Sequence, residues 1–372
     1  MVQLLDISRM HAEVDAAIKT ALLEVYQSGQ YILGPWVPQL ERELATWLGV
    51  PHTVGVSSGT DALVAALEAV GFAPGGRWIT TPFTFVASAD AIVRAGGQPV
   101  FVDVEEDTLL MDPAQVEAAC GPGTAGLVPV HLFGQCVDMD AMLAIAGARN
   151  IPIIEDIAQA MGARWKGRLA GSIGRFGCFS FFPSKNLGCL GDGGLISAQS
   201  DADAAELRSI RAHGSKKKYH HERIGGNYRL DSLQAAVLLA KLPRLEAWNE
   251  ARQAVAARYN LLLEQAGLVS RGLVRPLGLQ AGSTHVFHQY VVRAKDRDAL
   301  AAHLGQHGIG NAIYYPVPLH LQKCFANLGY REGSFPVAEQ AAREVLALPI
   351  FPGLTAAEQE EVVGRINSFY GA

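Results

Sequence analysis

From residue 52 to about residue 200, the sequence alternates between short apolar runs and segments with helical spacing. This alternation predicts an α/β fold, in which helices cover both faces of a mainly parallel central sheet. Ligands of such sheets bind at the carboxyl ends of the strands. Runs rich in Val, Ile and Thr predict strands at residues 52–56, 77–81, 99–104, 124–130 and 151–155. Helices are predicted between them, at residues 61–70, 86–95, 113–119 and 139–148.

The regions on either side of this alternation are richer in helices. Apolar positions three and four apart predict N-terminal helices at residues 10–29 and 36–48. Towards the C-terminus, helices are predicted at residues 201–212, 230–242, 245–266, 297–307, 338–345 and 356–370. Strand-like runs are predicted among them, at residues 284–292 and 312–315. We therefore expect a large domain over residues 1–245, including the N-terminal helices, and a smaller α+β domain over residues 246–372.

The composition argues against several classes of partner. The chain has 372 residues, of which 49% are hydrophobic and 18% charged, and its net charge is −5. This balance lacks the clustered basic residues of a nucleic-acid-binding surface. No apolar run reaches the roughly 18 residues of a membrane helix, and the N-terminus does not resemble a signal peptide. The cysteines are scattered without a Cys-x-x-Cys pair, which argues against a disulfide framework or a zinc site. We expect a cytoplasmic protein with no nucleic-acid, membrane or metal partner.

The stretch FGCFSFFPSKNLGCLGDGG, residues 176–194, places one lysine at the end of a strand. Residues 176–182 predict a short buried strand that Pro183 ends, and Lys185 follows at once. A lysine there can lose its charge through desolvation or cationic neighbours and become a nucleophilic amine. The best-known use of such an amine is a Schiff base with pyridoxal phosphate (PLP). The alternative is an ordinary solvated loop lysine.

A second stretch, Ser57-Ser58-Gly59-Thr60, joins a predicted strand to a predicted helix. Free N–H groups and the positive end of the helix dipole bind phosphate at such a position, and hydroxyl groups add donors. Ser180, on the strand before the lysine, could supply another hydroxyl. The alternative is a plain helix N-cap, where Ser and Thr are favoured in any case.

A third stretch ends the strand at residues 151–155 with two acids, Glu155 and Asp156. Burying a carboxylate is costly unless it has a partner. The protonated ring nitrogen of PLP is one such partner, because the cofactor needs an acid there to act as an electron sink. The alternative is a helix-capping aspartate.

Other chemistries have less support. The sequence has neither a GxGxxG motif that opens a helix after the first strand nor a GxxxxGK[ST] motif, so nicotinamide and ATP binding lose their main support. The basic segment SKKKYHH, residues 215–221, suits either a diphosphate or a solvated loop. Its two histidines lack the ligand spacing of a metal site.

In the order phosphate turn, acid, hydroxyl and lysine, these motifs resemble the DegT/DnrJ/EryC1/StrS family of PLP-dependent nucleotide-sugar aminotransferases. The resemblance runs from YILGP at residues 31–35 to YYPVPLH at residues 314–320. SSGTDAL, EDIAQAMGA, FSFFPSKNLG, GDGG and GGNYRLDSLQAA are all similar to family signatures. The resemblance implies the fold of the fold type I PLP-dependent transferases.

The resemblance also implies how the cofactor is held. Lys185 would form the covalent bond to PLP and transfer protons. Asp156 would pair with the ring nitrogen, Gln159 would lie near the ring hydroxyl or the ring face, and Phe85 would stack on the ring. Asn227 would reach the phosphate of the other subunit's cofactor, so the active unit would be a homodimer with shared active sites. The phosphate would also be held by Gly59, Thr60 and Ser180.

The implied reaction transfers an amino group from a donor, L-glutamate, to a keto-sugar carried on a nucleoside diphosphate. It would follow a ping-pong cycle with Lys185 as general acid and base. Tyr31, Arg229 and His320 would line the sugar site. The turn at residues 185–194 is similar to that of members that aminate C3″ of UDP-2-acetamido-3-keto-hexuronate or dTDP-3-keto-6-deoxyhexose.

Three alternatives remain open at this point. The chain could aminate C4″ within the same family. It could be a PLP-dependent sugar dehydratase, although these relatives carry histidine in place of the lysine. It could also be a non-catalytic regulatory protein with a PLP-enzyme fold, which should have lost Lys185 or Asp156. The sequence names neither the nucleotide nor the sugar.

Overall fold

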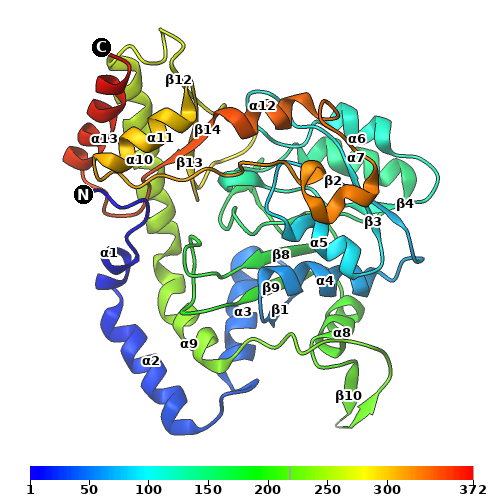
Figure 1. Ribbon diagram of the computed structural model, residues 1–372. Helices are drawn as coiled ribbons and strands as arrows, with labels where there is room; N and C mark the ends of the chain where they lie inside the picture. Colours follow the sequence, from blue (N-terminus) through cyan, green and yellow to red (C-terminus); the bar gives the residue numbers. More distant parts are fainter. Residues whose placement is uncertain (218, 372) are drawn as a thin grey trace.

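The computed structural model describes residues 1–217 and 219–371 and is organised around a large sheet (Figure 1). Parallel bridges from Leu127 to Ile153 and from Val130 to Asp156 join a four-stranded and a three-stranded portion, in the order β1-β9-β8-β5-β4-β2-β3. β9 is antiparallel to both of its neighbours, β1 and β8. All neighbouring strands from β8 through β5, β4 and β2 to β3 are parallel. The predicted mainly parallel sheet is therefore confirmed. Its strands are β1 (His52–Val56), β2 (Arg77–Thr80), β3 (Gln98–Phe101), β4 (Thr124–Leu127), β5 (Ile154–Asp156), β8 (Phe176–Ser180) and β9 (Gly194–Ala198).

Helices cover both faces of this sheet because successive strand residues point to opposite sides. Ile153 and Leu195 pack with one set of helices, and their neighbours Ile154 and Ile196 pack with the other set. The first set is α3 (Trp36–Leu48), α6 (Pro113–Ala119), α7 (Met139–Arg149) and α9 (Ser232–Lys241). The second set is α4 (Gly59–Val70), α5 (Ala87–Arg94) and α8 (Asp201–Ile210).

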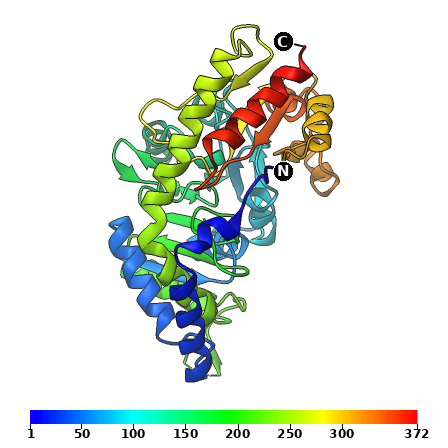
Figure 2. The ribbon, with the colours of Figure 1, turned by 90° about the vertical axis from the view of Figure 1, so that its left-hand side faces the viewer.

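A smaller antiparallel sheet, β12-β13-β14, belongs to the C-terminal part of the chain. The long helix α10 (Leu245–Gln265) lies against α13 and crosses the front of the view in Figure 2. Val2 bridges Ile309, and Met10 packs in the same apolar cluster as the C-terminal elements. The predicted domain boundary, between residues 245 and 246, falls at the start of α10. This division into two domains stays a prediction. The C-terminal elements are β12 (Val274–Pro276), β13 (Tyr290–Ala294), α11 (Arg297–Gln306), α12 (Pro336–Glu344), β14 (Val345–Leu348) and α13 (Ala356–Phe369).

Several predicted elements have different bounds in the structure. The helix predicted at residues 10–29 is divided into α1 (Ile7–Ala12) and α2 (Asp15–Ser28). The strand predicted at residues 284–292 begins only at Tyr290, because the backbone turns at Phe287, which has φ +43° and donates its N–H to the His285 ring. The run at residues 312–315 forms a single bridge, from Ala312 to Ala347, and no strand.

The remaining elements are short hairpins and 3-10 turns. Within the described residues, no helix is both long and apolar enough to cross a membrane. Lys218, part of the basic segment noted in the sequence, lies outside the described residues. The short elements are β6 (Arg164–Trp165), β7 (Arg168–Leu169), β10 (Ser215–Lys217), β11 (His220–His221), η1 (Leu132–Gly134), η2 (Leu242–Arg244), η3 (Leu319–Leu321) and η4 (Lys323–Leu328).

Candidate active site

The candidate site lies at the edge of the large sheet where the parallel strands end. β5 ends at Asp156, and β8 ends at Ser180, shortly before the turn that carries Lys185. The antiparallel strand β9 begins at the same edge, since Gly194 pairs with both Val56 and Ser180. Segments far apart in the sequence are therefore brought together at the place where sheets of this type bind ligands.

Lys185 is half-buried in the turn that follows β8, and its backbone N–H donates to the Phe182 carbonyl at 2.8 Å. Burial disfavours the charged ammonium form and lowers the pKa of Lys185 to about 8, although the Asp156 carboxylate acts in the opposite direction. With a pKa of about 8, roughly a tenth of the Lys185 side chains carry the neutral, nucleophilic amine at pH 7, far more than for an ordinary lysine.

Asp156 is a buried carboxylate with defined partners. Its Oδ2 accepts a hydrogen bond from the Ser88 hydroxyl at 2.7 Å, and its Oδ1 accepts from the Ala158 N–H at 3.0 Å. Burial raises the pKa of Asp156, whereas these two hydrogen bonds and the positive charge of Lys185 act to lower it. The Ser88 and Ala158 bonds fix the orientation of the carboxylate at the strand end.

The segment between β1 and α4 combines a helix cap with a possible anion site. Ser58 is the N-cap of α4 and accepts the Asp61 N–H, and the Ser57 hydroxyl donates to the Asp61 carboxylate at 2.7 Å. The backbone N–H groups of Gly59 and Thr60 have no acceptor among the described residues. Gly59 and Thr60 are the first residues of α4, and the positive end of the helix dipole favours an anion there. The capping and phosphate interpretations of this stretch are therefore compatible.

Ser180 lies directly against this helix start. A Cβ atom on residue 59 would come within 2.7 Å of the Ser180 Cβ, so the close approach of α4 to β8 requires glycine at this position. The predicted phosphate-binding residues Gly59, Thr60 and Ser180 are thus brought together by the structure.

Aromatic side chains and Gln159 form another part of the site. The Gln159 Oε1 accepts the Phe133 N–H at 2.7 Å, and its Nε2 donates to the Tyr315 hydroxyl at 2.9 Å. The rings of Tyr315 and Phe85 lie 6.3 Å apart, and Phe85 is 55% exposed. An exposed phenylalanine at this edge is available to cover a planar ligand.

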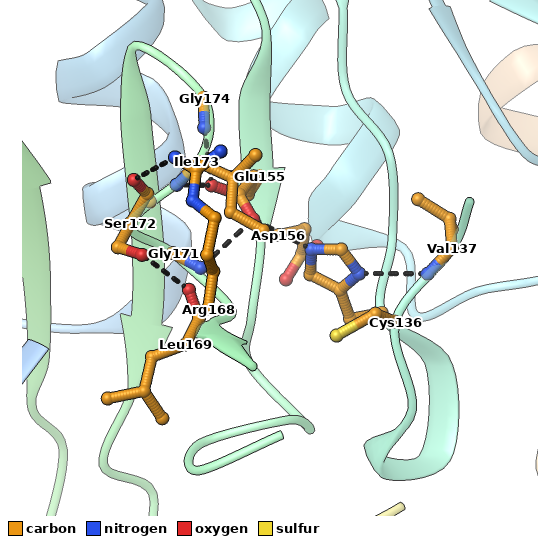
Figure 3. A network of polar contacts seen from close by, with 12 residues as sticks. Cys136, Val137, Glu155, Asp156, Arg168, Leu169, Gly171, Ser172, Ile173 and Gly174 are labelled. Carbon is orange, nitrogen blue, oxygen red and sulfur yellow. Dashed lines mark hydrogen bonds and ion pairs between the residues drawn. The ribbon is translucent and has the colours of Figure 1, made fainter. Parts of the chain in front are cut away.

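Glu155 has a structural role, in contrast to its neighbour Asp156. Its carboxylate accepts the N–H groups of Gly171 and Ile173, both at 2.9 Å, and of Gly174 at 2.7 Å (Figure 3). The His131 Nε2 lies 3.0 Å from the carboxylate, and the His131 Nδ1 accepts a backbone N–H from Val137.

Burial acts to raise the pKa of Glu155, but the hydrogen bonds from His131 and the glycine backbone outweigh it, so the pKa of Glu155 lies below its ordinary value. Because its hydrogen-bonding capacity is used within the protein, Glu155 anchors residues 171–174 and does not offer its carboxylate to a ligand.

Two other predicted residues lie on the segment beside β1. Arg229 bridges Val56, and the Arg229 Nε is buried without a hydrogen-bond partner in the part of the chain that the structure describes. Asn227 is exposed on the same segment. Tyr31 is also exposed, and its carbonyl accepts the Ser232 N–H just beyond this segment.

His320 is in a different environment from the other predicted residues. It lies in η3, 2% exposed, with its Nε2 3.0 Å from the Glu339 carboxylate of α12 and its ring 4.8 Å from that of Phe335. The side chain is thus engaged in packing within the C-terminal part of the chain. Its assignment to the sugar site stays a prediction.

Sequence reasoning missed two residues of the site, Ser88 and Tyr315. Ser88 lies three residues after Phe85, and Tyr315 belongs to the stretch YYPVPLH that resembles the family. No local pattern indicates that Ser88 bonds Asp156 or that Tyr315 bonds Gln159, because these contacts depend on strand order and on the path of the C-terminal segment.

The residues present suit PLP. The cofactor needs an amine, an acid for its ring nitrogen, a surface for its ring and donors for its phosphate. Lys185 and Asp156 are close enough to perturb each other's charge, Phe85 is exposed, and the unbonded N–H groups of Gly59 and Thr60 are available to a phosphate. The glycine at residue 59 lets the Ser180 side chain lie directly against this helix start.

Comparisons with known proteins agree with this geometry. The DegT/DnrJ/EryC1/StrS aminotransferase family profile matches residues 12–367. The pleiotropic regulatory protein of Geobacillus stearothermophilus is 48% identical over 99% of this chain and 98% of that protein. UDP-2-acetamido-2-deoxy-3-oxo-D-glucuronate aminotransferase of Pseudomonas aeruginosa is 41% identical over 99% and 100%. The dTDP-3-amino-3,4,6-trideoxy-alpha-D-glucose transaminase of Streptomyces venezuelae is 42% identical over 99% and 96%.

Solved structures give the same result. The crystal structure of DesV from S. venezuelae superposes with a TM-score of 0.95 at 40% identity and covers 100% of this chain and 99% of its own. NtdA from Bacillus subtilis with bound cofactor PMP superposes with a TM-score of 0.90 at 29% identity, over 99% and 85%. The expected fold is therefore confirmed.

The lowered pKa of Lys185 predicts how this amine reacts in the cofactor-free protein. Competitive acetylation with acetic anhydride, followed by peptide mass spectrometry, should show the reactivity of Lys185 rising through about pH 8, because only the neutral amine reacts. The Asp156 carboxylate favours the ammonium form, so Asp156→Asn should move the midpoint to lower pH. A midpoint near the ordinary lysine pKa of about 10.4 would contradict this account of the site.

Proposed function

Since the chain belongs to the DegT/DnrJ/EryC1/StrS aminotransferase family, we propose that it binds PLP and transfers an amino group from L-glutamate to a keto-sugar on a nucleoside diphosphate. The observation that carries this proposal is the Lys185–Asp156 pair at the carboxyl edge of the parallel strands. The anion site at Gly59 and Thr60 lies at the same edge and supports it. The similarity to the two relatives that are named as sugar aminotransferases covers nearly the whole chain.

PLP supplies an electron sink for the carbon that loses or gains the amine. Lys185 would provide the attachment point and would hold or release a proton at its amine. Asp156, oriented by Ser88, would pair with the ring nitrogen. The N–H groups of Gly59 and Thr60 would bind the phosphate, with the Ser180 hydroxyl beside them.

We propose C3″ as the position that receives the amine. The turn at residues 185–194 carries Leu-Gly after the lysine and Asp before the paired glycines, in the pattern that resembles C3″ enzymes. The names of the Pseudomonas and Streptomyces relatives both specify position 3 of the sugar. If the chain instead aminates C4″, it should accept a 4-keto-sugar and give a product with the amine at C4″.

A UDP-2-acetamido-3-keto-hexuronate is the substrate that we propose among 3-keto-sugars. Identities of 41% and 42% do not separate the UDP-hexuronate relative from the dTDP-deoxyhexose relative, so the argument rests on Arg229. This arginine lies beside the end of β1, and its Nε has no partner among the described residues. A guanidinium group can bind a sugar carboxylate through two hydrogen bonds.

A regulatory role without catalysis is the second candidate, and the name of the Geobacillus relative favours considering it. A protein without catalytic activity has no need of the paired Lys185 and Asp156, which this chain retains. A dehydratase of the same family would carry histidine in place of Lys185. Turnover with a keto-sugar and glutamate separates an aminotransferase from both alternatives.

We propose a cytoplasmic homodimer in which each subunit completes the other's site. Large apolar side chains are exposed around the lysine turn: Phe182 is 52% exposed and Leu190 is 44% exposed. Phe85 and Asn227 are exposed as well. A second subunit and the ligands would cover these groups, as interfaces usually do for exposed apolar patches.

Substitutions at Lys185 and Asp156 test the chemistry itself. Lys185→Ala should abolish the formation of 2-oxoglutarate from L-glutamate in the presence of a panel of UDP-, dTDP- and GDP-linked keto-sugars. Asp156→Asn should lower kcat about ten- to a hundredfold, since a hydrogen bond to a charged group contributes roughly 1.5–3 kcal/mol. Lys19→Ala, at an exposed lysine of α2, is the matched control. Turnover near wild type for Lys185→Ala would rule out the proposed function.

The product and the effect of Arg229 test the substrate. With UDP-2-acetamido-3-keto-hexuronate, NMR of the product should place the new amine at C3″. Arg229→Ala should reduce kcat/KM for this acid about ten- to a hundredfold and leave kcat/KM for dTDP-3-keto-6-deoxyhexose nearly unchanged. Arg229→Lys, which keeps the charge but not the planar pair of donors, should be intermediate. A product aminated only at C4″, or equal losses on both sugars, would contradict the assignment.

Hybrid dimers test the shared site. Lys185→Ala and Asn227→Ala should each be inactive alone. When the two variants are mixed under conditions of subunit exchange, half of the dimers are hybrids with one intact site, so about a quarter of wild-type activity should return. Native mass spectrometry verifies the exchange. No recovery in confirmed hybrids would mean that Asn227 serves its own subunit.

A further inference from the structure

The turn that carries Lys185 closes on itself just beyond the lysine. The Cys189 N–H donates to the Phe181 carbonyl at 2.8 Å, across the base of the turn. A Cβ atom on residue 188 would lie 2.5 Å from the Pro183 carbonyl oxygen, so Gly188 packs directly on the backbone that precedes Lys185. The position of Lys185 is therefore coupled to the position of residues 188 and 189.

Three polar side chains from α9 and α10 bind the residues after Lys185. The Gln234 Oε1 accepts the Leu190 N–H at 2.8 Å, and the Asn249 Oδ1 accepts the side-chain amide of Asn186 at 2.7 Å. Between these two, the Lys241 ammonium donates to the Gly188 carbonyl. Gln234 and Lys241 lie about two helical turns apart on α9, and Asn249 lies near the start of α10.

Lys241 is an unusual member of this set, because it is 1% exposed and cationic. Its Nζ also lies 3.0 Å from the His11 Nε2 of α1 and 5.9 Å from the centre of the Trp248 ring. Within residues 1–217 and 219–371, Lys241 forms no ion pair with a carboxylate. Its burial is costly without such a partner, whereas an apolar residue of the same length would pack there without that cost.

The surroundings set the charge of this group. Burial lowers the pKa of Lys241 to about 8, although the nearby Cys189 thiol acts to raise it. Burial, followed by the charge of Lys241, lowers the pKa of His11. The neutral His11 ring can therefore accept a hydrogen bond from the ammonium. Two acceptors, one on the turn and one on α1, thus share a single cation.

We propose that Lys241 is a positioning residue for Lys185. By joining the Gly188 carbonyl to His11 and the face of Trp248, its ammonium group keeps the turn closed and holds the Lys185 amine towards Asp156. This inference rests on the proposed function in one respect, namely that Lys185 is the reacting amine. It adds a contribution from α1 and α9, which the contact between Lys241 and His11 brings together.

The test uses Lys241→Met in the full-length, cofactor-loaded protein, because methionine keeps an apolar stem and removes the donors. Hydrogen exchange at the amides of residues 185, 189 and 190 should become at least about tenfold faster, while amides of β4 and β5 stay as in wild type. In transamination, kcat should fall about tenfold or more, since small misplacements of a reacting group are costly, and KM for the nucleotide sugar should stay within about twofold. Lys19→Met, an exposed lysine on α2, is the matched control and should change none of these values.

A structural role alone would give a different result. If exchange accelerates equally in the turn and in the central strands, Lys241 supports global stability and the proposal is overturned; unchanged exchange in the turn overturns it as well. If Lys241→Met does not fold, His11→Leu serves as a second variant, because it removes one of the two acceptors of Lys241. The same local increase in exchange is expected, and its absence would count against the proposal. If the wild type aminates no keto-sugar, the exchange result still tests Lys241, so the two proposals can fail separately.

Discussion

The buried carboxylate of Asp156 is the group around which the site is arranged. A charge at the end of a buried strand is costly unless the fold provides partners for it. Ser88 and the Ala158 N–H provide two hydrogen bonds, and the amine of Lys185 provides an opposite charge. These partners come from α5, from the residues after β5 and from the turn after β8. The orientation of the Asp156 carboxylate therefore depends on the order of the strands, because that order brings its partners together. The carboxylate in turn provides the negative charge of the site.

The adjacent acid, Glu155, shows how strand geometry separates two chemically similar residues. Successive residues of a strand point to opposite sides, so Glu155 reaches the backbone of residues 171–174 and His131, while Asp156 reaches Ser88. The environments shift their pKa values in opposite directions: the pKa of Glu155 is lowered and that of Asp156 is raised. One acid is used to hold a loop, and the other remains available to a ligand.

The turn after β8 connects this arrangement to the rest of the molecule. Its closure depends on glycine at residue 188 and on side chains from α9 and α10. Lys241 extends the connection to α1, which packs with the C-terminal elements through Met10. The turn that carries Lys185 is thus connected by hydrogen bonds to elements from the beginning, the middle and the second half of the chain.

The sequence by itself determined the fold class and the strand-end position of the main groups. Strand–helix alternation gave the mainly parallel sheet, because burial on both faces needs continuous apolar runs and covering helices. The positions of Lys185, Asp156 and the Gly59–Thr60 turn followed from the carboxyl-end rule. Only the tertiary structure decided that β9 is antiparallel, that Ser88 and Tyr315 belong to the site, and that His320 bonds Glu339. These contacts join residues far apart in the sequence, and local patterns carry no information on which strands and loops become neighbours.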